Sequence, residues 1–230
     1  MKPLLSVLTI AACAVLLKPV ANAATVLGAG ASPGDFLIGG DLTDPEDDGT
    51  PDGLNYNATF NSSEEPGFGG GEFAFNVFSN TVGGGNNKWC CGGGSPGVFP
   101  IWIDATFSQP VQLTSFTLTS GNDSPQRDPQ VWQIQGSNDG VNFTNIFSHG
   151  GGAPSNVFAN RNETILWDAA DFTTAAAYTT LRLNVEQTGA TAGALWQLNE
   201  IEYFGNVIPE PSAFALFGMA GIGLILRRRR

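Results

Sequence analysis

The chain has 230 residues, with 21 acidic and ten basic side chains and a formal net charge of −11. Six of the ten basic residues belong to two terminal segments with the features of targeting signals, so the residues between them are strongly acidic. This charge disfavours binding to nucleic acid or anionic lipid, and it favours cations and solubility outside the cell. The remaining length suits a single domain.

The N-terminus has the parts of a secretory signal peptide. Lys2 precedes an apolar stretch over residues 4–17, and Ala21-Asn22-Ala23 satisfies the small-x-small rule for signal peptidase. We predict a signal peptide over residues 1–23, with Ala21 and Ala23 at the cleavage site. The alternative is a lipoprotein box that ends at Cys13, but the apolar run continues past this cysteine where a lipoprotein usually turns polar.

An acidic segment near the start of the body resembles the beginning of a calcium loop. It places oxygens at positions 1, 3, 5 and 9 and a turn at Gly49. Position 12 is Asn55, where a bidentate Glu is usual, and two prolines stiffen the segment. A structural calcium ion and a solvated acidic loop both remain open. The candidate ligands in this loop are Asp44, Glu46, Asp48 and Asp52.

From residue 72 onward, apolar or alternating runs of strand length are separated by turn-forming residues. Trp132 and Ile134 share one face of such a run, and Asp139-Gly140 predicts the hairpin turn that follows it. Residues 168–178 have room for one short helix. We predict an all-β fold, an antiparallel jelly-roll β-sandwich of about eight strands. The expected strands cover residues 72–79, 99–107, 111–119, 130–136, 142–147, 164–167, 180–186 and 195–204.

Two adjacent cysteines, Cys90 and Cys91, remain after the signal peptide is removed. An exported protein can hold a disulfide. Neighbouring Cα atoms are about 3.8 Å apart, below the usual disulfide range of roughly 4.4 to 6.8 Å. A vicinal bridge, free thiols and intermolecular bridges all remain open. A zinc site is disfavoured, because His149 is the single histidine available to complete it.

A polar loop over residues 121–129 has side chains that suit a polar ligand. Its carboxylates and amide accept hydrogen bonds from hydroxyl groups, and its guanidinium donates them. The candidate ligand-binding residues are Asn122, Asp123, Arg127 and Asp128. In the alternative interpretation, Arg127 pairs with Asp123 or Asp128 and only shapes the loop. Trp89, in a glycine-rich segment, is the best candidate for an exposed stacking platform, whereas Trp102 and Trp132 are expected in the core.

Catalytic residues are scarce. His149 lies in a glycine-containing turn, and no nucleophile motif accompanies it. We therefore predict that the protein is not an enzyme, although a glycosidase carboxylate pair is not excluded by composition alone.

The C-terminal segment, residues 207–230, has three parts: Pro209-Glu210-Pro211, an apolar run over residues 214–226, and Arg227, Arg228, Arg229 and Arg230. The apolar run of about 13 residues is short for a membrane span, where roughly 17 to 25 are usual. The arginines would stay on the cytoplasmic side. This pattern resembles the PEP-CTERM sorting signal of Gram-negative bacteria. The resemblance implies transient anchoring in the inner membrane, processing near Pro209 by an exosortase-type membrane protease, and delivery to the cell surface or extracellular matrix. A plain C-terminal membrane anchor is the alternative.

A second resemblance covers roughly residues 73–205. Gly136-Ser137-Asn138-Asp139-Gly140, Asn87-Lys88-Trp89 and the closing segment 195–205 are similar to the discoidin-type (F5/8 type C), galactose-binding-like β-sandwich. The resemblance implies one domain over residues 24–206 and a binding module whose end loops hold carbohydrate, polysaccharide or another surface ligand. It also implies a calcium ion near the termini, which would recruit Glu200, although the usual Asp before Asn87-Lys88-Trp89 is absent.

Two functions follow as hypotheses. The first is an exported, non-enzymatic module that binds polysaccharide or surface glycan, with signal peptidase and an exosortase-type protease as processing partners and no nucleic-acid partner. The second is a structural matrix protein whose sandwich serves as a spacer without a specific ligand.

Overall fold

The computed structural model describes residues 24–29, 37–45, 56–65, 70–91, 99–173, 176–189 and 195–209. The predicted signal peptide, the C-terminal signal beyond Pro209, and Glu46, Asp48 and Asp52 lie outside these ranges. Within these ranges, no helix has the length and apolar character needed to cross a membrane.

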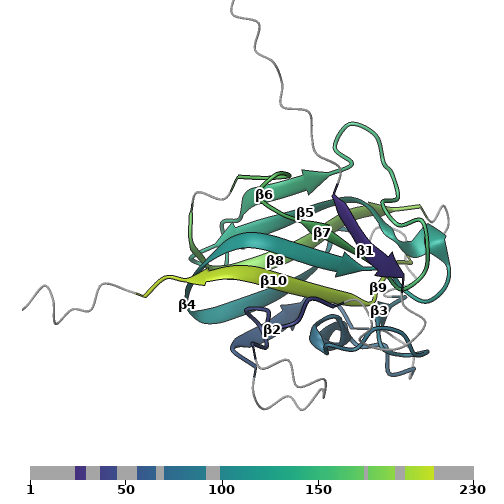
Figure 1. Ribbon diagram of the computed structural model, residues 1–230, viewed down its shortest axis with the longest axis horizontal. Coiled ribbons are helices and arrows are strands. Elements are labelled where there is room, and N and C mark those ends of the chain that lie inside the picture. Colours follow the sequence, from purple (N-terminus) through teal and green to yellow (C-terminus); the bar gives the residue numbers. More distant parts are fainter. Residues whose placement is uncertain are drawn as a thin grey trace, which may run out of the picture.

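A single strand of 19 residues, β4 (Ile101–Thr119), belongs to both layers of the fold (Figure 1). Its first part lies between β2 (Ala58–Ser62) and β8 (Tyr178–Thr188). Its second part pairs with β10 (Glu200–Val207) and, near its end, with β7 (Glu163–Trp167). The strand therefore carries the chain from one sheet of the sandwich into the other.

The remaining strands extend these two layers. β8 also pairs with β5 (Pro129–Ser137), which pairs with β6 (Thr144–His149), and β7 also pairs with β1 (Thr25–Ala29). All of these pairings are antiparallel, so the predicted all-β antiparallel sandwich is confirmed.

The core between the layers is rich in aromatic rings. Phe116 of β4 stacks on Trp167 of β7 with ring centroids 5.2 Å apart, and Trp132 of β5 meets Trp167 edge to face at 5.3 Å. All three rings are buried. Such contacts add to the free energy gained from removing large apolar surfaces from water. Trp132 is in the core as predicted, whereas Trp102 is only partly buried.

Several predicted elements differ from the observed ones. Residues 74–78 form a short 3-10 helix, η1 (Ala74–Phe78), instead of a strand, because Ala74, Val77 and Phe78 are buried with helical spacing. The strands expected at 99–107 and 111–119 are joined as β4. Residues 168–173 form a turn in place of the expected helix. Three strands were not predicted: β1, β2 and the two-residue strand β3 (Trp89–Cys90).

The predicted hairpin between β5 and β6 is confirmed. Gly140 has a positive φ of 69°, which a turn requires and glycine adopts without strain. Ser137 Oγ accepts the Gly140 amide at 3.0 Å, and Asp139 Oδ1 accepts the amides of Val141 and Asn142 at 2.9 and 2.7 Å. These local contacts close the turn independently of the rest of the sandwich.

A small second sheet lies at one end of the sandwich (Figure 1). It consists of β3 (Trp89–Cys90) and β9 (Gln197–Leu198), which pair antiparallel. β9 is separated from β10 by Asn199, whose amide donates to the Thr119 carbonyl oxygen at the end of β4. The polar loop that follows β4, which contains the 3-10 helix η2 (Pro125–Arg127), is thereby brought against β3 and β9.

Candidate functional site

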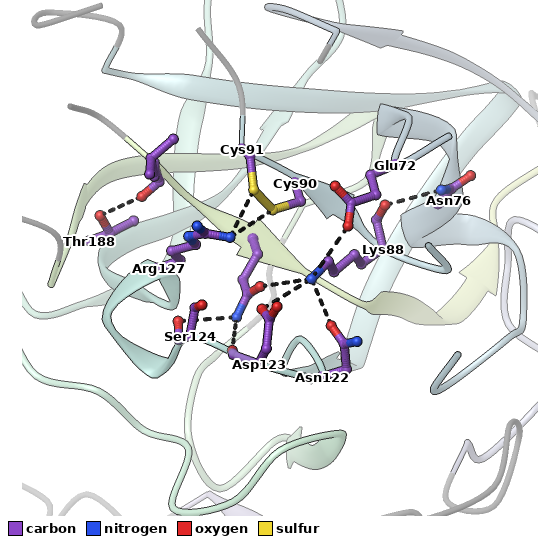
Figure 2. The surroundings of a disulfide bond; sticks show 12 residues. Glu72, Asn76, Lys88, Cys90, Cys91, Asn122, Asp123, Ser124, Arg127 and Thr188 are labelled. Atoms are coloured by element: carbon purple, nitrogen blue, oxygen red, sulfur yellow. Dashed lines mark hydrogen bonds and ion pairs between the residues drawn. A yellow bond between two sulfur atoms is a disulfide. The ribbon is translucent and has the colours of Figure 1, made fainter. Parts of the chain in front are cut away.

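The ammonium group of Lys88 organises the polar loop (Figure 2). Its Nζ lies 2.7 Å from Asn122 Oδ1, 3.1 Å from Asp123 Oδ1 and 3.3 Å from Gln197 Oε1. Glu72 Oε1 lies 3.5 Å away on the other side. One side chain therefore joins the loop after β4 to β9 and to the segment before η1.

Burial makes this contact important for stability. The Lys88 side chain is only 2% exposed, and a buried charge is tolerated where opposite charges and hydrogen bonds replace water. Glu72 is also nearly buried, whereas the Asp123 side chain is 53% exposed. The inner partner therefore compensates the charge of Lys88, and the outer partner keeps a surface that a ligand can reach.

Gln197 holds the backbone of the same loop. Its Nε2 donates to the Asp123 carbonyl oxygen, and also to that of Ser124 at 3.2 Å. Ser124 has a left-handed conformation, with φ of 44°, which non-glycine residues seldom adopt. The contacts of Gln197 and Lys88 thus support a bend that the local sequence would not favour.

Arg127 faces a disulfide between Cys90 and Cys91 (Figure 2). Its Nη1 lies 3.0 Å from Cys91 Sγ and 3.6 Å from Cys90 Sγ. The alternative prediction, that Arg127 pairs with Asp123 or Asp128, was wrong. Asp128 is fully buried and pairs instead with Arg161, whose Nη1 lies 2.8 Å from Asp128 Oδ1.

These positions sort the sequence-predicted binding residues into two groups. Asn122, Asp123 and Arg127 meet at one face, around Lys88 and the disulfide. Asp128 lies beneath them as a buried support, because it has no exposed surface. The vicinal bridge, one of the alternatives for the two cysteines, is the arrangement that the structure contains.

Trp89 was expected to be an exposed platform, and the structure contradicts this. Its side chain is fully buried and meets Trp196 edge to face, with centroids 4.1 Å apart. The glycines around it suggested an exposed loop, but pairing of β3 with β9 turns the ring inward. Trp89 therefore contributes to the support of the site and not to its surface.

Glu72 and the two cysteines place possible metal ligands within 4.8 Å of one another. The sulfur atoms are joined to each other, so they are not thiolates. Lys88 and Arg127 also occupy this place with two positive charges. A metal ion does not fit this cluster in the disulfide form.

A second polar cluster is built from buried carboxylates. Asp41 Oδ1 accepts the amides of Thr43 and Asp44 at 2.6 and 2.8 Å. Glu202 accepts the Gly39 amide at 2.8 Å and the Thr117 hydroxyl at 2.7 Å. These acids come from the N-terminal segment and from β10, which lie together because the Leu42 amide donates to the Tyr203 carbonyl oxygen at 2.7 Å.

Asp44 and Glu200 meet at Asn80 within this cluster. Asn80 Nδ2 donates to Asp44 Oδ2 at 2.6 Å, and the Asn80 amide donates to Glu200 Oε1 at 3.2 Å. Glu200 Oε2 is buried and has no hydrogen-bond partner in the described ranges. Burial raises the pKa of Asp41 to about 7 and raises that of Glu200 well above its usual value.

The carboxylates of this cluster do not converge on one point: within the described residues, no three of them place one oxygen each within 4.8 Å of the others. Carboxylate and amide oxygens are the ligands that calcium prefers, and an unpaired buried carboxylate oxygen is costly without a cation or proton. Of the five predicted metal ligands, Asp44 and Glu200 are in this cluster, and the other three lie outside the described residues. Asp41, Glu202 and Asn80 were missed, because their proximity depends on pairing distant segments.

Two other surface features lie on separate parts of the sandwich. A cavity of about 480 Å³ is lined by residues of β2, η1 and β4, among them Phe60 and Phe75, and by Glu65 after β2. On the outer face of β4 and β8, the Arg182 guanidinium lies 4.0 Å from the ring of Trp102 and 3.7 Å from that of Phe143. Arg182 also pairs with Asp104, so this group is satisfied within the protein.

His149 has a serine neighbour but not the setting of a catalytic base. Its Nε2 lies 3.1 Å from Ser155 Oγ and 3.0 Å from the Ser155 carbonyl oxygen. The carbonyl oxygen can only accept, so it favours the tautomer that carries a proton on Nε2. Over the ranges that the structure covers, no carboxylate is hydrogen-bonded to this ring, as a catalytic triad would require.

Comparison with family models decides the family. The model of the F5/8 type C domain matches residues 57–197, which include β2 to β8, Lys88 and the polar loop over residues 121–129. The chain belongs to the F5/8 type C domain family. This F5/8 type C domain is followed by a PEP-CTERM protein-sorting motif over residues 207–230. Both predicted resemblances are therefore confirmed.

Solved structures with a similar fold include carbohydrate-binding modules. CpGH89CBM32-5 from Clostridium perfringens, solved with GalNAc-beta-1,3-galactose, has 16% identity and a TM-score of 0.48 over 67% of this chain and 98% of its own. Chitosan-binding module 1 of a Paenibacillus chitosanase/glucanase has 20% identity and a TM-score of 0.46. The match covers 72% of this chain and 98% of that module. The family 32 carbohydrate-binding module of Streptococcus pneumoniae EndoD has 11% sequence identity and a TM-score of 0.48. The match covers 65% of this chain and 96% of the EndoD module.

One curated relative shares a short region. A peptide-N(4)-(N-acetyl-beta-glucosaminyl)asparagine amidase of Arabidopsis thaliana is 39% identical over 54 residues. These residues are 24% of this chain and 7% of the amidase, so the chain spans only a small part of that relative.

Replacing Lys88 by Met should destabilise the F5/8 type C domain. The apolar stem is kept, but Glu72 loses its buried countercharge and three further oxygens lose their donor. We expect the free energy of unfolding to fall by about 3 kcal/mol, measured by urea denaturation. Asn145→Ala, on the exposed edge strand β6, is the control and should change it by less than about 0.5 kcal/mol. An equally small loss for Lys88→Met would contradict the stabilising role.

Proposed function

We propose that the protein is an exported, non-enzymatic module that binds carbohydrate or polysaccharide at the ligand face, defined as Asn122, Asp123, Arg127 and the Cys90–Cys91 disulfide. The observation that carries the proposal is the state of Arg127. It is partly exposed, and within the described residues its guanidinium forms no ion pair with a carboxylate. Lys88, Arg161 and Arg182 each have such a pair.

The ligand face combines donors and acceptors that match sugar hydroxyl groups. Arg127 presents a planar set of donors next to sulfur atoms, which are weak acceptors and leave the charge uncompensated. The Asp123 carboxylate is half exposed and accepts hydrogen bonds. A sugar hydroxyl can both donate and accept, so it can bridge the two side chains. Membership of a family of binding modules supports this interpretation.

The described residues also favour binding over catalysis. Asp123 and Asp128, the carboxylates of the loop, are held by Lys88 and Arg161. A glycosidase needs one acid that protonates the leaving group and one that remains ionised, placed across a substrate. The two loop carboxylates are instead held in ion pairs with basic side chains of the fold.

Binding to an array of glycans tests the proposal, with the exopolysaccharide of the producing bacterium, GalNAc-β-1,3-galactose and chitosan oligosaccharides among the probes. Replacing Arg127 by Ala should weaken binding to the exopolysaccharide by roughly 10- to 100-fold, since a hydrogen bond to a charged group contributes about 1.5 to 3 kcal/mol. Arg127→Lys should recover only part of the loss, because the planar fork is absent.

Asn145→Ala is the binding control, because Asn145 pairs with Gln135 at the end of β5 that is remote from the loop before Pro129. Equal affinity of the wild type and Arg127→Ala would remove this face from the binding site. No affinity of the wild type for any glycan would instead support a structural spacer.

We also propose that the PEP-CTERM motif directs the domain to the cell surface or extracellular matrix of a Gram-negative bacterium. In this proposal, signal peptidase removes residues 1–23, the apolar run 214–226 holds the chain transiently in the inner membrane, and an exosortase-type protease cuts near Pro209-Glu210-Pro211. The motif match over residues 207–230 supports it.

Changing Pro209, Glu210 and Pro211 together to alanine should therefore block release. The variant should accumulate in the membrane fraction, and mass spectrometry should find its C-terminal arginines still attached. Ser212→Ala, next to the motif, is the control and should be processed normally. Release of the triple variant at the wild-type rate would show that another feature directs sorting.

We further propose that the acidic cluster of Asp41, Asp44, Glu200 and Glu202 holds a structural calcium ion. Support comes from the buried, unpartnered Oε2 of Glu200 and from the burial of all four carboxylates. No three of these carboxylates place oxygens within 4.8 Å of one another among the described residues, so the ion would draw them together. The ion would stabilise the domain by compensating buried negative charge, and it would join the N-terminal segment to β10.

Excess calcium should raise the melting temperature relative to excess chelator. A ligand at about 100 times its Kd stabilises by about 2.7 kcal/mol, which corresponds to roughly 5 to 10 °C for a domain of this size. Glu200→Gln should lose most of this increase, whereas the same substitution at exposed Glu186 should keep it. A wild-type melting temperature that is the same in calcium and chelator would contradict the site.

A further inference from the structure

The Cys90–Cys91 disulfide lies where the small sheet meets the ligand face (Figure 2). The Cys91 amide donates to the Trp196 carbonyl oxygen at 2.8 Å, and the Cys90 amide donates to that of Glu72 at 3.3 Å. Cys90 is buried and Cys91 is partly exposed. The bridge is thus held by backbone contacts from below and can be reached by solutes at Cys91.

Three different sets of contacts hold the loop that carries Arg127. Arg161 and Asn156 hold its end, at Asp128 and the Pro125 carbonyl oxygen. Lys88 and Gln197 hold its first half, at Asn122, Asp123 and Ser124. The second half meets β3 through the contacts of Arg127 with the two sulfur atoms. Arg127 Nε is buried and has no hydrogen-bond partner in the part of the chain that the structure covers. Within these residues, the contacts of Nη1 with the two sulfur atoms hold the guanidinium in place.

The bridge also restrains the backbone beneath Arg127. The bond between adjacent cysteines closes a ring that includes their shared peptide, and Cys91 has a positive φ of 64°. Non-glycine residues adopt this left-handed conformation at a cost and keep it where the surroundings enforce it. Opening the ring removes one of these restraints, so Cys91 and the sulfur surface under Arg127 become free to move.

We propose that the disulfide is the positioning element for Arg127, and that glycan binding by the ligand face therefore depends on the oxidised state of Cys90 and Cys91. This inference rests on the proposed function of the same face. In the reduction, a dithiol supplies two electrons and two protons, the S–S bond breaks, two cysteine thiols form, and the dithiol becomes a disulfide. The contacts of Lys88 and Gln197 are unaffected, so the fold is retained while the guanidinium loses its fixed place.

The proposal gives the protein a dependence on its compartment. Outside the cell, where disulfides persist, the face would be competent to bind. In a reducing compartment, or before oxidation is complete, Arg127 would be less well ordered and binding would be weak. Affinity would thus develop after export, when the polysaccharide of the surface or matrix becomes accessible.

The test measures binding of the purified processed protein to immobilised exopolysaccharide of the producing bacterium. Affinity is compared in the oxidised protein, after reduction by dithiothreitol, and after reoxidation, with thiols titrated in each sample. We expect at least a 10-fold loss of affinity on reduction and recovery on reoxidation, with the far-ultraviolet circular dichroism spectrum unchanged. C90S/C91S should bind as weakly as the reduced protein and should not respond to dithiothreitol.

Arg127→Ala separates positioning from a general structural effect. It should bind weakly in both redox states, because the group that the bridge positions is already absent. A further large loss on reduction of Arg127→Ala would overturn the assigned role of the bridge. Reduced wild-type protein provides the same comparison if C90S/C91S does not fold.

The outcomes distinguish this inference from the function on which it rests. Equal affinity of the oxidised and reduced wild type overturns the inference and leaves glycan binding intact. Absence of binding by the oxidised protein overturns the proposed function, and the inference with it.

Discussion

The structure depends on the continuity of β4 across both layers of the sandwich. Because this strand pairs with β2 and β8 first and then with β10 and β7, it determines which distant segments become neighbours. Both polar clusters lie at its C-terminal end. Glu200 of β10 is the register partner of Thr119, and the loop to Arg127 leaves β4 directly after that residue. The segment from Gln197 to Glu202 contributes to both clusters.

The distribution of charge explains why these clusters differ. Between the terminal signals the chain has four basic residues in an acidic body. Lys88, Arg161 and Arg182 are committed to carboxylates within the fold. Arg127 lies against sulfur atoms instead, so within the described residues no carboxylate compensates its charge. At the acidic cluster, backbone amides take the place of basic side chains only in part. Glu200 Oε2 is therefore left without a hydrogen-bond partner in the described ranges.

Buried residues support the ligand face. Trp89 and Lys88 adjoin each other in sequence and both are buried, yet they stabilise an exposed loop from below. Trp89 packs on Trp196, and Lys88 holds Asn122 and Asp123. A binding surface needs such rigid support, since a loop that must become ordered on binding loses affinity to the entropy of ordering.

Features that depend on neighbours in sequence were predictable. Alternation placed Trp132 and Ile134 in the core, and Asp139-Gly140 located the hairpin, because strand period and turn chemistry are local. The family and the sorting motif were also recognisable from short patterns. The prediction of a strand at residues 72–79 was wrong for a local reason too, since the spacing of its apolar residues also fits the turn of η1.

The sequence by itself determined the all-β class, the acidic character of the body, and the polar loop as the place to look for a ligand. Only the tertiary structure decided which side chains act together. Arg161 instead of Arg127 pairs with Asp128, Trp89 faces inward, and Asp44 meets Glu200 at Asn80. The physical reason is that each of these contacts joins segments far apart in the chain, and their proximity follows from strand pairing, which no local pattern encodes.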